Sequence, residues 1–147
     1  DADVERSLFE PFYEHMLDND FERDFACYLD SRAAVRWWHR NVARSGYALQ
    51  GWRRNKVYPD FVFLKTEHDG SETLMVMETK GAHLANEDTD YKRALLARLE
   101  AAWRDDRLQQ AGELELVSGS GDRLCCRLVF DQNWRNTLEQ EIFGKSA

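Results

Sequence analysis

The stretch "YPDFVFLKTEHDGSETLMVMETKG", residues 58–81, contains two apolar runs separated by a polar loop. Short apolar runs bounded by turn-forming residues and rich in β-branched and aromatic side chains are typical of the two strands of a β-hairpin. Both runs are apolar at successive positions, which indicates strands that are covered on both faces and lie centrally in a sheet. Each run nevertheless carries an acid at the end away from the loop, Asp60 in the first and Glu78 in the second.

Symmetric pairing around the loop of residues 66–72 predicts which side chains face each other. If Lys65 faces Thr73, then Asp60 lies directly opposite Glu78 on the same face of the hairpin. Like charges in directly opposed positions destabilise an antiparallel pair. The acids therefore require either exposure to water or a ligand that holds both of them.

A divalent cation removes this repulsion. Magnesium takes oxygen ligands and is typically held by one or two carboxylates plus water and phosphate oxygens. The carbonyl of Thr79 adds a third protein ligand, and Lys80 places an ammonium beside the metal, where it stabilises negative charge on a phosphate. This set predicts metal-assisted phosphodiester hydrolysis. The open alternative is that Asp60 and Glu78 are solvated strand-end charges with Lys80 as a counter-charge.

The remaining apolar patterns predict an α/β protein. Helices are expected over residues 8–17, from the capping box of Asn19 and Glu22 onward, from Ser31 to near Gly46, from residue 88 or 89 to just before Gly112, and over residues 134–142. Further strands are expected over residues 47–52, 114–117 and 124–130. This order implies that helices cover a mixed sheet in a single domain spanning residues 1–147.

The composition indicates a globular domain and not a membrane protein. The 147 residues are 43% hydrophobic and 32% charged, and no apolar run approaches the roughly 18 residues of a membrane span, so no membrane association is expected. The lack of an initiator Met and of a leader predicts a domain excised from a larger multidomain protein. Cys27, Cys125 and Cys126 lack metal-ligand spacing, which favours reduced core residues in a cytoplasmic protein.

Positive charge is concentrated in one interval of an acidic chain. The formal net charge is −7, yet no acid occurs between Asp30 and Asp60. That interval contains Arg32, Arg36, Arg40, Arg44, Arg53, Arg54 and Lys56. The first four recur every four residues and predict a basic stripe on one helix, for which backbone phosphates are the expected partner. A solvated helix face or a contact with a partner domain is the open alternative.

Three tryptophans lie among these charges, namely Trp37, Trp38 and Trp52. Aromatic side chains interleaved with Arg can stack on unpaired bases. A Trp also buries a large apolar area, so a core position for Trp38 and one other is an equally good interpretation.

The hairpin residues also carry a resemblance. Pro59-Asp60, followed after a hairpin-length gap by Glu78-Thr79-Lys80, resembles the signature of the PD-(D/E)XK nuclease superfamily. Over roughly residues 8–110, "ERDFACYLD", "WWHRN", "YPDF", "ETKG" and "HLANEDTDYK" look most like the C-terminal endonuclease domain of the restriction (Res) subunit of type III restriction enzymes and related helicase–nuclease proteins.

The resemblance implies a restriction-endonuclease-like three-layer α/β/α core and a Mg²⁺-dependent DNA endonuclease, with Mn²⁺ as a substitute ion. It implies that Asp60 and Glu78 bind the metal with the Thr79 carbonyl, that Lys80 is catalytic, and that Glu22 points to the metal. The expected partners are DNA and the helicase or translocase domains of the same parent protein. The residues expected to contact DNA are Arg36, Arg40, Arg53, Arg54 and Lys92. The second hypothesis is a nuclease-like fold that serves only in binding DNA or a partner domain.

Overall fold

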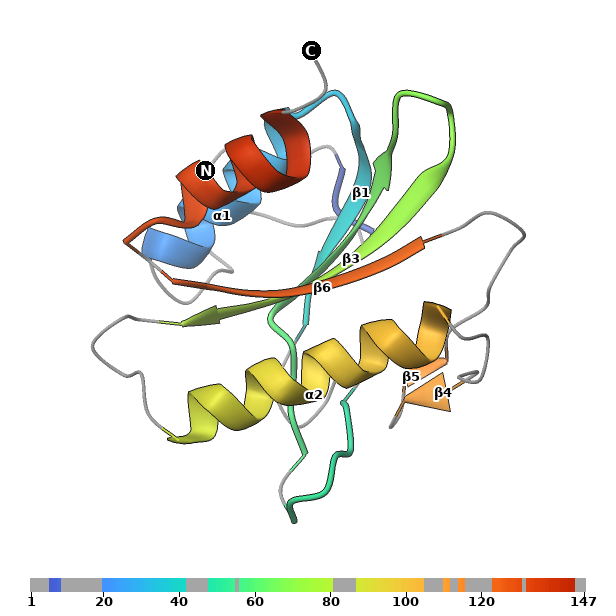
Figure 1. Ribbon diagram of the computed structural model, residues 1–147. Helices are drawn as coiled ribbons and strands as arrows, with labels where there is room; N and C mark the ends of the chain where they lie inside the picture. Colours follow the sequence, from blue (N-terminus) through green and yellow to red (C-terminus); the bar gives the residue numbers. More distant parts are fainter. Residues whose placement is uncertain are drawn as a thin grey trace.

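A four-stranded mixed sheet forms the centre of the protein (Figure 1). The computed structural model describes residues 6–8, 20–41, 48–54, 56–80, 87–104, 110–111, 114–115, 123–130 and 132–144. The sheet has the order β1-β2-β3-β6, in which β1–β2 and β2–β3 are antiparallel and β3–β6 is parallel. Its strands are β1 (Val35–Arg40), β2 (Phe61–Thr66), β3 (Glu72–Lys80) and β6 (Arg123–Phe130). The predicted α/β class with a central mixed sheet is confirmed.

Helices cover both faces of this sheet. Figure 1 shows α1 and the C-terminal helical segment on one face and α2 on the other. The helices are α1 (Asp20–Ser31), α2 (Glu87–Arg104), α3 (Trp134–Thr137) and the π-helical η3 (Leu138–Phe143). A separate two-stranded sheet pairs β4 (Gln110–Ala111) with β5 (Leu114–Glu115). Among the described helices, none has the length and apolar character needed to cross a membrane.

The predicted hairpin is confirmed, and so is its register between Phe61 and Thr66. The pairs run from Phe61–Met77 near the open end to Thr66–Glu72 beside the loop, and they include Lys65–Thr73. The loop turns at Gly70, whose φ of 84° lies in the left-handed region that favours glycine. β2 and β3 occupy the two central positions of the sheet, as their apolar composition predicts.

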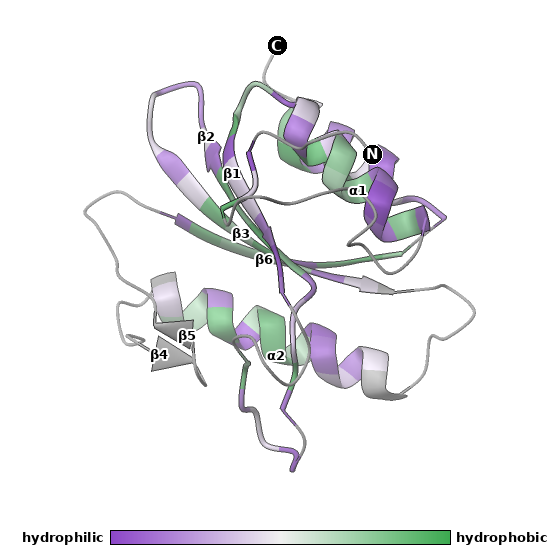
Figure 2. Cartoon of the chain, turned by 180° about the vertical axis from the view of Figure 1, so that it is seen from behind, coloured by the Kyte–Doolittle hydropathy of each residue, from purple (hydrophilic) through white to green (hydrophobic). Residues whose placement is uncertain are grey.

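Strand alternation divides the buried residues into two cores. Phe61, Phe63, Met75 and Met77 join the core under α1 and the C-terminal helices, whereas the intervening residues of β2 and β3 join the core under α2. We call the core under α1 and the C-terminal helices the first core, and the core under α2 the second core. The adjacent residues Cys125 and Cys126 of β6 separate in the same way, because Cys125 packs against the first core and Cys126 lies in the second. Figure 2 shows green, apolar strand segments between the helical layers and polar, purple residues around the hairpin loop.

The predicted helix that begins at residue 88 or 89 is present as α2, and one face of it is buried. The residues buried along it or packed against the second core are Tyr91, Leu95, Leu96, Leu99 and Trp103. The predicted closing helix is also present, and it buries Trp134, Leu138 and Ile142. The predicted helix over residues 8–17 lies outside the described residues, apart from Leu8.

Three predictions from local pattern are wrong. Residues 35–40 form β1 instead of a helix, because this run pairs with the edge of β2 and puts Trp38 in the first core and Trp37 against the second. In the predicted strand of residues 47–52, the described part forms only an isolated bridge between Leu49 and Val57. Cys27 is exposed because α1 turns Phe25, Ala26, Tyr28 and Leu29 towards the sheet.

Candidate active site

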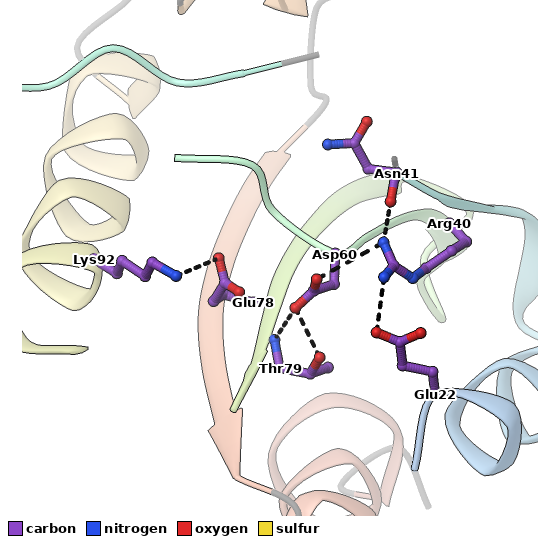
Figure 3. Close-up of polar contacts among 7 residues, drawn as sticks. All are labelled: Glu22, Arg40, Asn41, Asp60, Glu78, Thr79 and Lys92. Carbon is purple, nitrogen blue, oxygen red and sulfur yellow. Dashed lines mark hydrogen bonds and ion pairs between the residues drawn. The ribbon is translucent and has the colours of Figure 1, made fainter. Parts of the chain in front are cut away.

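The topology gathers several charged residues at one edge of the sheet (Figure 3). Because β1 and β3 both run antiparallel to β2, the ends of β1 and β3 lie beside the beginning of β2. Arg40 is the last residue of β1, Asp60 immediately precedes β2, and Glu78 is close to the end of β3. Glu22 reaches the same edge from the first turn of α1, and Lys92 reaches it from α2.

Asp60 is held by backbone contacts on both sides. The amide of Asn41 donates to the Asp60 carbonyl over 2.7 Å, and the Asp60 amide donates to the carbonyl of Met77 over 3.1 Å. The Asp60 carboxylate oxygen Oδ2 accepts hydrogen bonds from the amide of Thr79 at 2.8 Å and from its hydroxyl at 2.7 Å. The side chain of Asp60 thus takes a place that a backbone carbonyl would hold in a regular ladder.

This arrangement corrects the predicted pairing at the end of the hairpin. The ladder between β2 and β3 ends at Phe61 and Met77, so Asp60 does not continue it opposite Glu78. The Asp60 carboxylate binds Thr79, the residue that follows Glu78, so it lies at the same edge of the sheet, while the Glu78 side chain points to the other face, towards α2. The two acids are neighbours through Thr79 and not through direct cross-strand pairing.

Arg40 lies between two of the acids. Its Nη2 is 2.7 Å from Oε1 of Glu22, and its Nη1 is 3.8 Å from Oδ1 of Asp60. Nη1 also donates to the carbonyl of Asn41, and the guanidinium lies over the ring of Phe61 with its carbon 5.7 Å from the ring centroid. The prediction that Arg40 lies on an exposed basic stripe is wrong, because strand alternation turns it inward on the side of α1.

Glu22 is brought to the edge from α1. It is only 7% exposed, and its carboxylate meets the guanidinium of Arg40. A buried carboxylate is costly unless a positive charge or hydrogen bonds compensate it. Arg40 supplies that compensation, so Glu22 and Asp60 are linked through one cation. Asn19, the other member of the predicted capping box, lies outside the described residues.

Glu78 faces the opposite helical layer. It is 4% exposed, and its Oε2 lies 3.8 Å from Nζ of Lys92 on α2. Lys92 is therefore directed at a carboxylate of the site, which differs from the predicted role of reaching substrate phosphates. Lys80 closes β3 and pairs with Phe130 of β6, and its side chain lies outside the described part of the structure.

The donor types at this edge suit magnesium. Asp60 and Glu78 supply hard carboxylate oxygens at the same edge of the sheet, Asp60 on the side of the Thr79 hydroxyl and Glu78 towards Lys92 of α2, and magnesium needs one or two carboxylates when water and substrate phosphates complete its shell. Over the described residues, no group of three or more His, Cys, Asp or Glu side chains is arranged to hold a metal ion. The described donors are therefore too few for a closed protein cage of the kind that holds structural zinc.

The other predicted DNA contacts do not form a single surface with this site. Arg36 lies near the start of β1, at the far end of that strand from Arg40, and pairs with Glu72 beside the hairpin loop. Arg53 and Arg54 are exposed in the segment that follows Leu49, next to α2. The predicted basic residues therefore lie in three separate places. Arg40 points inward at the site, Arg36 lies near the hairpin loop, and Arg53 and Arg54 are exposed beside α2.

Two contributions to the site were missed in the sequence. The bridging role of Arg40 and the backbone support from Asn41 both depend on residues 35–40 being a strand. The available signal was the run "VRWWHR", whose aromatic and β-branched side chains favour a strand over a helix. Strand alternation from Trp38 then places Arg40 on the buried face.

Comparisons with known proteins add no relative. No family model matches the chain, no curated protein matches it, and no solved structure matches it. The functional argument consequently depends on the geometry of the site itself.

Proposed function

We propose that this protein is a Mg²⁺-dependent endonuclease domain that hydrolyses DNA phosphodiester bonds. In this proposal, which rests on the resemblance for its biological setting, the domain is the cleavage module of a type III-like restriction or helicase–nuclease system in the cytoplasm. The observation that carries the chemistry is the gathering of Glu22, Asp60 and Glu78 at one edge of the sheet, two of them buried.

This gathering has a stability cost that the fold alone does not explain. Carboxylates avoid burial, and clustered acids raise one another's energy when ionised. Arg40 faces Glu22 and Asp60, and Lys92 faces Glu78. Buried charged clusters of this kind concentrate at functional sites, which favours a role in binding a cation.

Each residue has a distinct part in the proposed reaction. Asp60, Glu78 and the carbonyl of Thr79 would hold the metal, which would supply Lewis acidity towards the scissile phosphate. Thr79 fixes the orientation of the Asp60 carboxylate through two hydrogen bonds. Arg40 keeps Glu22 and Asp60 in place, and Lys80 supplies an ammonium for the charge that develops on the phosphate.

A plasmid-nicking assay tests the activity. Wild-type protein, in its full-length context, should nick supercoiled DNA in Mg²⁺ and not in EDTA. Asp60→Asn and Lys80→Ala should each lower the rate about 100-fold or more, because the first removes a carboxylate that holds the metal and the second removes the ammonium that stabilises charge on the phosphate. Asp69→Asn is the matched control, since this carboxylate lies in the hairpin loop and bonds only locally to Ser71 in the described contacts. Equal rates for wild type and Lys80→Ala would contradict the proposal.

Thermal melting gives a readout of the metal that does not require activity. An ion that binds only the folded protein stabilises it by mass action, by about 2.7 kcal/mol at a concentration 100 times the dissociation constant. Mg²⁺ or Mn²⁺ should therefore raise the melting temperature of wild type and of Asp69→Asn. The same increase in Asp60→Asn would place the metal somewhere other than this site.

The competing function is a nuclease-like fold that only binds DNA or a partner domain. The observation in its favour is that Arg40 and Lys92 already face the acids, so the cluster can serve as a structural ion-pair network. That function predicts DNA binding without nicking, and no metal-dependent shift in melting temperature. The two assays above therefore separate it from the endonuclease.

A further inference from the structure

An exposed tryptophan stands at the surface beside α2. Trp52 is 53% exposed, and among the described residues it is the most exposed large hydrophobic side chain. Exposing an indole to water is unfavourable, because a Trp contributes a large apolar area when it is covered. A position of this kind on a fixed segment therefore points to a ligand that covers the ring.

The segment that carries Trp52 is pinned at several points. Leu49 and Val57 exchange two backbone hydrogen bonds, of 2.7 and 2.8 Å, which close the loop between them. The amide of Arg53 donates to the hydroxyl of Tyr91 over 3.4 Å. Gly51 packs so closely on α2 that an added Cβ would collide with that hydroxyl. These contacts tie Gly51 and Arg53 to α2, which lowers the entropic cost of binding at Trp52 between them.

The ring of Trp52 belongs to a cluster of aromatic and arginine side chains. The guanidinium carbon of Arg98 lies 4.4 Å from the Trp52 ring centroid. Tyr91 meets Trp52 edge to face, with centroids 4.9 Å apart and planes at 86°. Arg53 lies over the Tyr91 ring at 4.6 Å. Planar guanidinium groups and indole rings are the surfaces on which nucleic-acid bases stack.

The charged residues of the loop that carries Trp52 are all basic. Arg53, Arg54 and Lys56 are all exposed on the same loop as Trp52, and the sequence from Asp30 to Asp60 contains no acid between those two residues. A polyanionic strand is therefore the complementary partner, with its phosphates at the cations and a base at the indole. A duplex cannot use the indole in this way, because its bases are already paired and stacked.

We infer that the Trp52 loop and α2 form a stacking site for an unpaired base of single-stranded nucleic acid. Trp52 and Arg98 provide the stacking surfaces, and Arg53, Arg54 and Lys56 bind the flanking phosphates. Lys92, which faces Glu78, is six residues before Arg98 on α2, a rise of about 9 Å. If the proposed function holds, the site therefore selects DNA with an unpaired segment next to the carboxylates; the binding itself does not depend on cleavage.

Fluorescence anisotropy in EDTA tests this binding without any reaction. The probes are a fluorescein-labelled oligothymidylate, the matching oligouridylate and a duplex of the same length. Trp52→Leu, which keeps apolar bulk and loses the aromatic face, should weaken single-strand binding about tenfold or more and leave duplex binding unchanged. Trp52→Phe, which keeps an aromatic face, should retain most of the affinity. Leu8→Ala, at another exposed large hydrophobic residue of the described part of the chain, should have no effect.

The arginine gives a second, independent variant. Arg98→Ala should weaken single-strand binding, whereas Arg23→Ala, which removes an arginine of α1 on the other face of the sheet, should not. Equal affinity of Trp52→Leu and Trp52→Phe for the single strand, or equal losses for single strand and duplex, would overturn the inference. Binding of the oligouridylate alone would assign the site to RNA. Wild-type protein that binds neither single strand would refute the stacking site and leave Trp52 to a protein partner.

The two proposals fail in different ways. Asp60→Asn should abolish Mg²⁺-dependent nicking and leave single-strand affinity in EDTA intact. Wild-type protein that binds the single strand but does not nick DNA in Mg²⁺ would refute the endonuclease and retain the stacking site. Wild-type protein that nicks DNA, with equal single-strand affinity for Trp52→Leu and Trp52→Phe, would refute the stacking site and retain the endonuclease.

Discussion

Replacing Arg40 by Met should destabilise the protein strongly, because it removes the cation shared by two carboxylates. The Arg40 side chain is 15% exposed and that of Glu22 is 9% exposed, so their 2.7 Å contact lies in a largely water-excluded environment. Removing one partner of a buried pair costs about 3–5 kcal/mol, because the remaining charge stays buried without compensation. The second acid, Asp60, is 3.8 Å away and has hydrogen bonds from Thr79, so its added contribution is smaller.

The partial exposure of the pair favours the lower end of this range, about 3 kcal/mol of unfolding free energy. For a chain of this size that corresponds to a decrease in melting temperature of roughly 6–12 °C. Urea denaturation of wild type, Arg40→Met, Glu22→Gln and the double variant measures the effect as a cycle. The double variant should recover most of the lost stability, because Gln at position 22 no longer leaves a buried charge.

Arg36→Met is the matched control on the same strand. Arg36 is exposed and pairs with Glu72 at the surface, so its replacement should cost less than about 1 kcal/mol. The reasoning would be refuted if Arg40→Met cost no more than Arg36→Met. It would also be refuted if Glu22→Gln failed to restore stability in the Arg40→Met background.

Two further predictions concern His39 and Gly51. Burial, with Arg40 beside it, lowers the pKa of His39 from 6.5, so the unfolded chain gains a proton at higher pH than the folded chain. Stability in urea should therefore fall as the pH drops from 6.5 towards the folded pKa; His39→Gln should weaken this dependence and His68→Gln should not. Gly51→Ala should cost about 1–3 kcal/mol through its collision with the Tyr91 hydroxyl, and adding Tyr91→Phe should recover part of that loss in thermal melting.

Much of the architecture follows from the sequence because local pattern and tertiary packing agree there. The hairpin of β2 and β3 has continuous apolar strands and a loop of defined length, so its register from Phe61 to Thr66 was predictable. The apolar stripe of α2 and the opposite directions of Cys125 and Cys126 were predictable for the same reason. The positions of Asp60 and Glu78 at one edge of the sheet follow from that register.

Other features depend on contacts between segments that are distant in the chain. Residues 35–40 have arginines at helical spacing but side chains that favour a strand, and the strand is selected because it pairs with β2 and the two cores accept Trp37 and Trp38 on opposite sides. That change turns Arg40 inward, where it meets Glu22 from α1. It also separates Arg36 from Arg40, which the prediction had placed on one face of a helix.

The chemistry of the site illustrates the same division. The sequence by itself determined that two acids and a lysine lie at the open end of a buried hairpin, because strand periodicity and loop length are local properties. Only the tertiary structure decided that Asp60 leaves the ladder to bind Thr79, and that Glu78 turns towards Lys92. The physical reason is that buried carboxylates take the donors and cations that the whole fold brings within reach, and no local pattern specifies which ones those are.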